Sequence, residues 1–298
     1  MKISVKVPAS SANLGSGVDT MGIALSLYLR CSFEEADTPS VTFGQGFDRP
    51  LPDADNYVLT AARALFERVG LPFPTLAVTI DTDIPLARGL GSSSAALVAG
   101  LWGANRFLPS PFPDEVLLTM AAEMEGHPDN VVPAALGGFT LAMSAQGELF
   151  TRRFPAPKLR FVAAIPAYRL STEKARRALP ESVPLADAVA QLQRACFLSQ
   201  ALAEGDFANL KLLTRDELFT PARAALMPGS AEARQAAVEA GALCAWVSGA
   251  GPTVLAPAEE DFDDIAMAMI SAYRPYGIHA KCLLLEADNL GVTARCED

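Results

Sequence analysis

The chain has 298 residues, 50% of them hydrophobic and 19% charged, which is enough to bury one large core or two smaller ones. Its net charge of −10 argues against a nucleic-acid-binding protein, because such proteins carry a basic face or stripe. We expect a soluble cytoplasmic protein without a membrane span, since no apolar run reaches about 18 residues and the 5 cysteines are scattered without a CxxC pair.

In the first half of the chain, strand patterns and helix patterns follow one another without a strict alternation. Strands are predicted where apolar and polar residues alternate, and helices where apolar residues recur at helical spacing. The third helix is expected to end near Gly126, with Pro128 beyond it. The predicted strands are 3–7, 21–36 and 76–85, the predicted helices are 56–70, 91–106 and 110–126, and a hairpin is predicted at 133–154.

The second half begins after a proline-punctuated stretch at residues 154–157, which we interpret as a domain boundary. Strands grouped with helices point to an α+β protein with two domains, residues 1–153 and 154–298. In the second domain the predicted helices are 185–204, 207–213 and 230–240, and the predicted strands are 155–168, 244–251 and 253–257, followed by a further helix and strand.

The stretch PLARGLGSSSAA, residues 85–96, places two glycines and three serines where a strand gives way to a helix. A helix N-terminus offers unpaired N–H groups and a positive dipole end, so such a loop favours a bound anion. A P-loop is excluded because no lysine follows Gly91, and a dinucleotide fingerprint would require a glycine where Ser94 stands. A serine-capped helix without a ligand remains the alternative.

Three further clusters of polar residues and glycines lie along the chain. Residues 8–22 (PASSANLGSGVDTMG) and 123–138 (EMEGHPDNVVPAALGG) place amides, carboxylates and a histidine in short loops. Residues 246–256 (WVSGAGPTVLA) form a second glycine-rich turn. Each cluster taken alone has an alternative explanation: an Asx-rich turn for residues 8–22, solvated glutamates on a helix face for 123–138, and a tight strand connection for 246–256.

Together and in this order, these motifs resemble the three signatures of the GHMP small-molecule kinases, over nearly the whole chain. Within that superfamily, the first motif, HPDN at 127–130 and STEKARRALP at 171–180 are most similar to the homoserine kinase family. The resemblance implies a two-domain fold, with an N-terminal α/β domain that carries a left-handed βαβ crossover and a C-terminal ferredoxin-like domain.

The same resemblance implies an activity. The reaction would be ATP- and Mg²⁺-dependent transfer of a phosphoryl group to the side-chain hydroxyl of L-homoserine, which gives O-phospho-L-homoserine for threonine biosynthesis. It implies a small-molecule substrate, no nucleic-acid or membrane partner, and a homodimer. The alternatives are a related kinase acting on a mevalonate-like or sugar hydroxyl, and a nucleotide-binding member of the fold without catalysis.

Matching positions in the family motifs imply the site residues. Asn56 would line the adenine pocket, and Ser93 would bind Mg²⁺ with Glu125, or with Glu123 as the alternative. The loop around the ATP phosphates would comprise Pro85, Leu86, Ala87, Arg88, Gly89, Leu90, Gly91, Ser92, Ser93, Ser94 and Ala95. Homoserine would be bound by Asn13, Asp19, His127, Asn130, Thr172, Arg176 and Arg223.

The substrate-side residues suit an amino acid, because Asp19 can bind an ammonium group and arginine's fork matches a carboxylate. Thr172 and Arg176 share a face if residues 171–176 are helical. Some relatives use an aspartate base where Asn130 stands here, and an amide cannot accept that proton. We therefore expect His127 and Asn130 to orient the hydroxyl without a general base. Asp129 is the one nearby acid that could act as a base instead.

Overall fold

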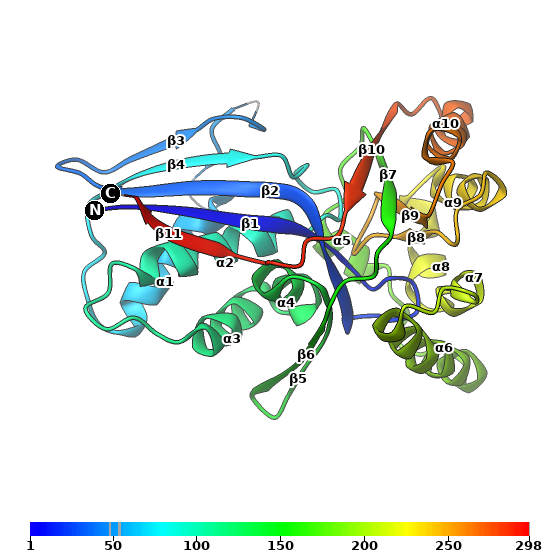
Figure 1. Cartoon of the computed structure of the whole chain (residues 1–298), viewed down its shortest axis with the longest axis horizontal. Helices are drawn as coiled ribbons and strands as arrows, with labels where there is room; N and C mark the ends of the chain where they lie inside the picture. The colour runs from blue at the N-terminus through cyan, green and yellow to red at the C-terminus, as the bar shows by residue number, and fades with distance from the viewer. Residues whose placement is uncertain (48, 53–54, 298) are drawn as a thin grey trace.

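The structure, a computed structural model, describes residues 1–47, 49–52 and 55–297. Its strands form two sheets with helices packed on them (Figure 1). The first sheet has the order β11-β1-β2-β4-β3 with the hairpin β5–β6 attached to β2, and the second has the order β10-β7-β9-β8. The strands are β1 (Lys2–Ala12), β2 (Met21–Glu35), β3 (Ser40–Phe43), β4 (Leu76–Thr82), β5 (Phe139–Ala145), β6 (Glu148–Phe154), β7 (Arg160–Pro166), β8 (Trp246–Val247), β9 (Val254–Ala258), β10 (Ala280–Glu286) and β11 (Thr293–Glu297).

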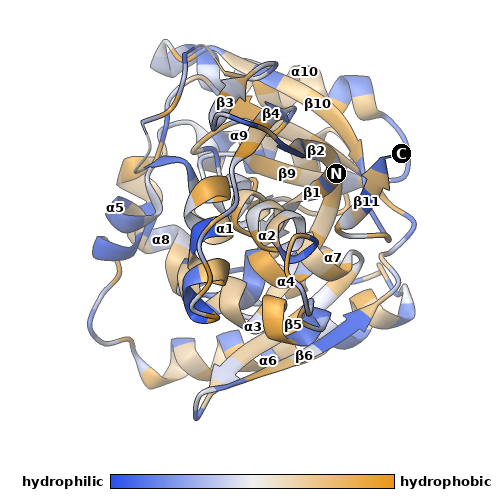
Figure 2. Cartoon of the chain, turned by 90° about the vertical axis from the view of Figure 1, so that its left-hand side faces the viewer, coloured by the Kyte–Doolittle hydropathy of each residue, from blue (hydrophilic) through white to orange (hydrophobic). Residues whose placement is uncertain are grey.

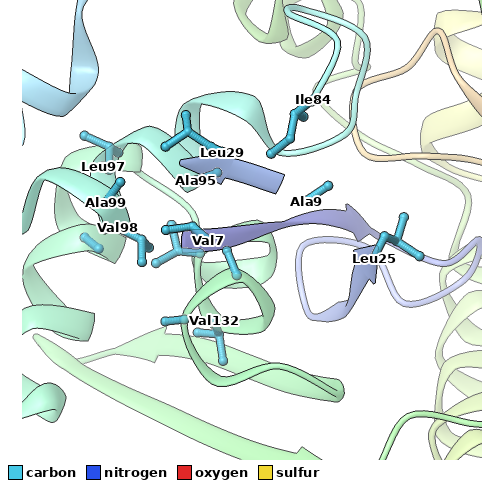
Figure 3. Close-up of a cluster of buried hydrophobic side chains, with 14 of the residues drawn as sticks. Val7, Ala9, Leu25, Leu29, Ile84, Ala95, Leu97, Val98, Ala99 and Val132 are labelled. Carbon is cyan, nitrogen blue, oxygen red and sulfur yellow. The ribbon is translucent and has the colours of Figure 1, made fainter. Parts of the chain in front are cut away.

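Four helices cover one face of the first sheet (Figure 1): α1 (Tyr57–Arg68), α2 (Ser92–Asn105), α3 (Asp114–Glu125) and α4 (Pro128–Leu136). Helix α2 is central, and every residue from Leu97 to Asn105 is buried. The close-up in Figure 3 shows Val98 of α2, Val7 of β1 and Val132 of α4 in this core. Burial of these side chains holds the N-terminal end of α2 rigidly beside the loops that follow the strands.

Helix α4 is the main element that the sequence pattern does not predict. The end of a helix near Gly126 is confirmed, because α3 ends at Glu125 and Gly126 has a φ of 84°. Pro128 then begins a new helix rather than ending the helical region, since the first N–H of a helix has no intrahelical partner. The predicted hairpin at 133–154 was wrong over its first residues, which belong to α4, and is confirmed from Phe139 onward.

The second sheet pairs its strands antiparallel throughout, in the order of the fourth, first, third and second strands, which is the ferredoxin-like order. Its core brings Val162 and Val254 of the sheet against Ala233, Ile265 and Met269 of two covering helices. The helices of this half are α5 (Thr172–Arg177), α6 (Leu185–Glu204), α7 (Leu210–Leu213), α8 (Phe219–Arg223), α9 (Ser230–Glu239) and α10 (Phe262–Tyr273), with short 3₁₀ turns η2 (Ala224–Leu226) and η3 (Arg274–Tyr276).

The second half differs from the predicted elements in two places. Helix α7 is shorter than the expected helix at 207–213, because the Asp206 carboxylate accepts a hydrogen bond from the Ala208 N–H and forms a turn first. Strand β11 pairs with β1, so the end of the chain returns to the first sheet. The boundary at residues 153 and 154 and the left hand of the crossover that joins β3 to the parallel strand β4 stay predictions.

None of the helices formed by residues 1–47, 49–52 and 55–297 is long and apolar enough to cross a membrane. In Figure 2, α5 carries mainly hydrophilic residues. Its sequence, TEKARR, buries only Ala175. This short polar helix lies beside the cavity described next, to which it contributes Thr172, Glu173 and Arg176.

Candidate active site

The glycine- and serine-rich loop leads into the N-terminus of α2. Gly91 is the N-cap residue, with a φ of 69°, and no side chain caps the helix. The alternative of a serine-capped helix was therefore wrong, because Ser92, Ser93 and Ser94 lie inside the first turn. Their hydroxyls and the first N–H groups of the helix are thus available for other partners, and the dipole of α2 favours an anion there.

Close packing explains why glycines occupy this loop. A Cβ atom at Gly89 would overlap the carbonyl oxygen of Ser248, and one at Gly91 would overlap the hydroxyl of Ser10. Both glycines also have positive φ, 77° at Gly89 and 69° at Gly91. The loop is therefore fixed from both sides, by the first motif through Ser10 and by the third motif through Ser248.

Glu125, the last residue of α3, faces the serines of α2. Its Oε1 atom accepts hydrogen bonds from the hydroxyl of Ser93 at 2.6 Å and from the hydroxyl of Ser94 at 3.0 Å. Glu123 is exposed and does not line the cavity. The geometry thus brings together Ser93 and Glu125, the two residues expected at the metal, and separates Glu123 from them.

His127, Asp129 and Asn130 lie where α3 passes into α4. Nδ1 of His127 is 2.8 Å from Oδ1 of Asp129, which is only 3% exposed. Burial alone lowers the pKa of His127, but the hydrogen bond to Asp129 and the charges of Asp129 and Glu125 raise it above its ordinary value of 6.5. Oδ1 of Asn130 accepts a hydrogen bond of 2.9 Å from Ser10, which leaves its Nδ2 group as a donor.

An acid and two arginines gather in the same region, although they are distant in sequence. Arg176 of α5 forms a two-fold ion pair with Asp19, at 3.0 Å and 3.3 Å. Arg223 of α8 is 4% exposed and donates to the carbonyl oxygens of Ala175 and Gly249. Burial and the charge of Arg176 lower the pKa of Arg223, so an anion beside both guanidinium groups would relieve their repulsion.

Asn13 and Asn56 both line the cavity, and their side chains also form hydrogen bonds with backbone groups. The Asn13 amide donates to the carbonyl of Gly249 at 3.0 Å and accepts from the N–H of Asp19 at 2.9 Å, which fixes the loop that carries Asp19. Asn56 is the N-cap of α1, where its Oδ1 accepts from the N–H of Leu59. The segment from Thr172 to Arg177 is helical, as expected, and Ser171 caps it.

A single cavity of about 490 Å³ connects these groups. It separates the predicted residues into two sets. Those that line it are Asn13, Asp19, Asn56, Leu86, Ala87, Gly89, Gly91, Ser92, Ser93, Glu125, His127, Asn130, Thr172, Arg176 and Arg223. Those that do not line it are Pro85, Arg88, Leu90, Ser94 and Ala95.

The structure also shows residues that the sequence patterns did not single out. Ser248 of the third motif donates to the carbonyl oxygen of Gly89 at 2.6 Å and lies 2.9 Å from the hydroxyl of Ser11. The cavity is also lined by Phe43 and Phe47, whose rings are in edge contact. The serine network could be expected from the polar residues of the two motifs, whereas no local signal marks the two phenylalanines.

Comparisons with known proteins agree with this arrangement. Residues 56–138 match the family model described as "GHMP kinases N terminal domain", and residues 198–274 match "GHMP kinases C terminal". The chain is 39% identical over 292 residues to a homoserine kinase of Desulfitobacterium hafniense, covering 97% of this chain and 98% of that protein. It is 45% identical over 271 residues to one of Thermus thermophilus, covering 90% and 91%.

Among solved structures, the homoserine kinase from Cytophaga hutchinsonii superimposes with a TM-score of 0.87 at 30% identity, covering 99% of this chain and 97% of that one. Similarity of this extent includes both sheets and all of the motifs around the cavity. The chain therefore belongs to the homoserine kinase family of the GHMP kinases.

Proposed function

We propose that the protein catalyses transfer of the γ-phosphoryl group of ATP to the side-chain hydroxyl of L-homoserine. The observation that carries this proposal is the presence of Asp19, Arg176 and Arg223 in the cavity that also contains the N-terminus of α2. A carboxylate suits the substrate ammonium, and guanidinium groups suit its carboxylate. A mevalonate-like or sugar substrate has no ammonium group, so it would leave Asp19 without a partner on the substrate.

The other end of the cavity suits the nucleotide. The N–H groups of the first turn of α2 and the backbone at Gly89 and Gly91 would hold the phosphates. Because Oδ1 of Asn56 is used by the N–H of Leu59, its Nδ2 group is the one left for the base. The apolar wall formed by Phe43 and Phe47 would pack on the ring of the base.

The donor atoms beside the phosphate loop fit Mg²⁺ that arrives with ATP. Mg²⁺ prefers oxygen ligands and is commonly held by one or two carboxylates together with phosphates of the substrate. The carboxylate of Glu125 and the hydroxyl of Ser93 supply such oxygens, 2.6 Å apart. When bound there, the ion would neutralise charge on the transferred group.

The protein's own groups would position the reacting hydroxyl rather than deprotonate it early. Asn130 offers an Nδ2 donor, and His127 is held in place by Asp129. Because the Asp129 carboxylate is buried and faces Nδ1 of His127, its first role is to orient that ring. Phosphoryl transfer through a loose transition state depends mainly on alignment and charge neutralisation, so the proton can leave late.

The proposal includes a homodimer in the cytoplasm, working in threonine biosynthesis. Helix α6 exposes Leu185 (80%), Val189 (44%) and Leu192 (65%) at spacings of four and three residues, which places them on one face. An exposed apolar stripe of this kind is typical of a protein interface. Light scattering of the wild type and of Leu192→Glu tests this, and a monomeric wild type would contradict it. The five free cysteines suit a reducing compartment.

Substrate analogues test the assignment of the amino-acid groups. 4-Hydroxybutyrate lacks the ammonium and 3-amino-1-propanol lacks the carboxylate, while both keep the primary hydroxyl. We expect each to react at least about 100-fold less efficiently than L-homoserine, because one charged partner in the cavity would stay unpaired. Equal turnover of all three compounds would contradict the proposed roles of Asp19 and Arg176.

A further inference from the structure

Four cationic or potentially cationic side chains line the cavity: His127, Arg169, Arg176 and Arg223. Three of them have partners. His127 contacts Asp129, Arg176 is paired with Asp19, and Arg223 donates to two carbonyl oxygens. Within residues 1–47, 49–52 and 55–297, the guanidinium of Arg169 makes no hydrogen bond or ion pair. Among these four side chains, Arg169 is therefore the one without a partner in the part of the chain that the structure describes, and its guanidinium faces a cavity that suits a ligand.

The backbone on either side of Arg169 is attached to the phosphate loop. The N–H of Leu170 donates to the carbonyl oxygen of Ala87 at 3.3 Å, and the Leu170 side chain is 5% exposed. From the loop, Arg88 donates to the carbonyl oxygens of Pro166 at 3.0 Å and Ala167 at 2.8 Å. Arg169 thus projects from a segment whose position is fixed relative to the loop.

The phosphate loop itself supplies no free cation. Arg88 is the one lysine or arginine between residues 85 and 95, and three carbonyl oxygens occupy its guanidinium. Burial and, to a smaller extent, the nearby positive charge of Arg169 lower the pKa of Arg88, as expected for a guanidinium group with a second one close to it. An anion bound beside Arg169 would offset part of the repulsion between the two guanidinium groups.

We infer that Arg169 is a further phosphate-binding residue, which pairs with the triphosphate of the nucleotide from the second sheet's side of the cavity. The inference rests on the proposed use of ATP. The arginine fork suits phosphate oxygens, and it would neutralise charge that the loop dipole and a bound Mg²⁺ leave uncompensated. Because Arg169 follows β7, it would also couple nucleotide binding to the half of the molecule that carries Arg176 and Arg223.

Calorimetric binding of ATP, ADP and AMP to the wild type, Arg169→Ala and Arg169→Lys tests the inference without relying on turnover. We expect Arg169→Ala to bind ATP about 10- to 100-fold more weakly and AMP within about two-fold of the wild type. Arg169→Lys should recover part of the ATP affinity. Arg177→Ala is the matched control, since Arg177 is 78% exposed, pairs with Glu173 and does not line the cavity.

Three other outcomes of the binding experiment would overturn the inference. Unchanged ATP affinity in Arg169→Ala would overturn the inference and leave the proposed kinase activity standing. An equal loss for ATP, ADP and AMP would also overturn it, because it would show a general disturbance of the nucleotide pocket rather than a lost phosphate contact. A wild type that binds no nucleotide would overturn both the inference and the proposed function.

Discussion

The Oε1 atom of Glu125 lies 2.6 Å from the hydroxyl oxygen of Ser93 and joins the last turn of α3 to the first turn of α2. Both residues line the cavity, whereas Glu123 is exposed to solvent. A carboxylate at a helix C-terminus is unfavourable for the dipole, so a cation beside Glu125 would be stabilising. This pair is the main structural support for the proposed Mg²⁺ site.

The first prediction compares the two glutamates. Glu125→Gln removes the negative charge and keeps the shape, so we expect kcat/KM to fall by at least about 100-fold, with a higher Mg²⁺ requirement. Glu123→Gln should stay within about two-fold of the wild type, because surface substitutions away from a site have small effects. A Mg²⁺ titration of the initial rate measures both, and the reverse ranking would move the metal to Glu123.

The second prediction concerns proton transfer. Asp129→Asn keeps an oxygen that can accept from Nδ1 of His127, so we expect it to retain activity within about ten-fold of the wild type. Asn130→Ala removes the donor beside the reacting hydroxyl and should reduce kcat by about 100-fold or more. Steady-state kinetics decide between them: if Asp129→Asn loses most activity and Asn130→Ala little, Asp129 acts as the base.

The third prediction is a pH dependence of stability. The pKa of His127 is raised in the folded protein, so the folded state binds this proton more tightly than the unfolded chain does. The resulting stabilisation is fully present below the unfolded value of 6.5 and is lost as the pH rises through the folded pKa. We expect the difference in free energy of unfolding between the wild type and His127→Asn to shrink across that range in urea titrations.

The fourth prediction concerns the backbone of the phosphate loop. Gly91→Ala combines strain at positive φ with overlap on the Ser10 hydroxyl. We expect it to lower the free energy of unfolding by about 2–3 kcal/mol and to weaken ATP binding. Gly205→Ala is the matched control, because Gly205 has a φ of 74° with no neighbour within 4 Å, and it should cost only about 1 kcal/mol. Equal losses in urea unfolding would show that packing against Ser10 contributes nothing.

The sequence pattern was sufficient to predict the helices and strands in which apolar residues recur at a regular spacing. Helix α6 spans residues 185–204 as predicted, and α2 and the hairpin β5–β6 follow from their patterns with small shifts. Strands β3 and β11 were not predicted, because they are short and their pairing depends on partners far along the chain. Helix α4 was missed because Pro128 can stop a helix or start one, and only the packing of α4 on β1 and β2 decides which.

The cavity residues show the same contrast between what local sequence predicts and what depends on distant parts of the chain. The motifs identified many of the residues that line the cavity, but not how their side chains contact one another. The pair of Asp19 and Arg176 joins residues 157 positions apart, and it depends on how α5 lies against the first sheet. Ser94 belongs to the predicted loop yet is fully buried beside Glu125, since the third residue of a helix turn faces away from the groups that the first residue meets. Arg169 carried no motif signal, because its place follows from the attachment of residues 166–170 to the loop.

In the proposed reaction, the protein phosphorylates the side-chain hydroxyl of an amino acid bound in this cavity. ADP release with Mg·ATP should be measured with L-homoserine beside mevalonate, L-threonine and L-serine, under identical conditions. We predict turnover with a strong preference for L-homoserine, because that compound has both charges and a primary hydroxyl on a side chain of the matching length. Turnover of mevalonate instead would contradict the roles of Asp19, Arg176 and Arg223, and the absence of turnover with every compound would contradict the kinase assignment itself.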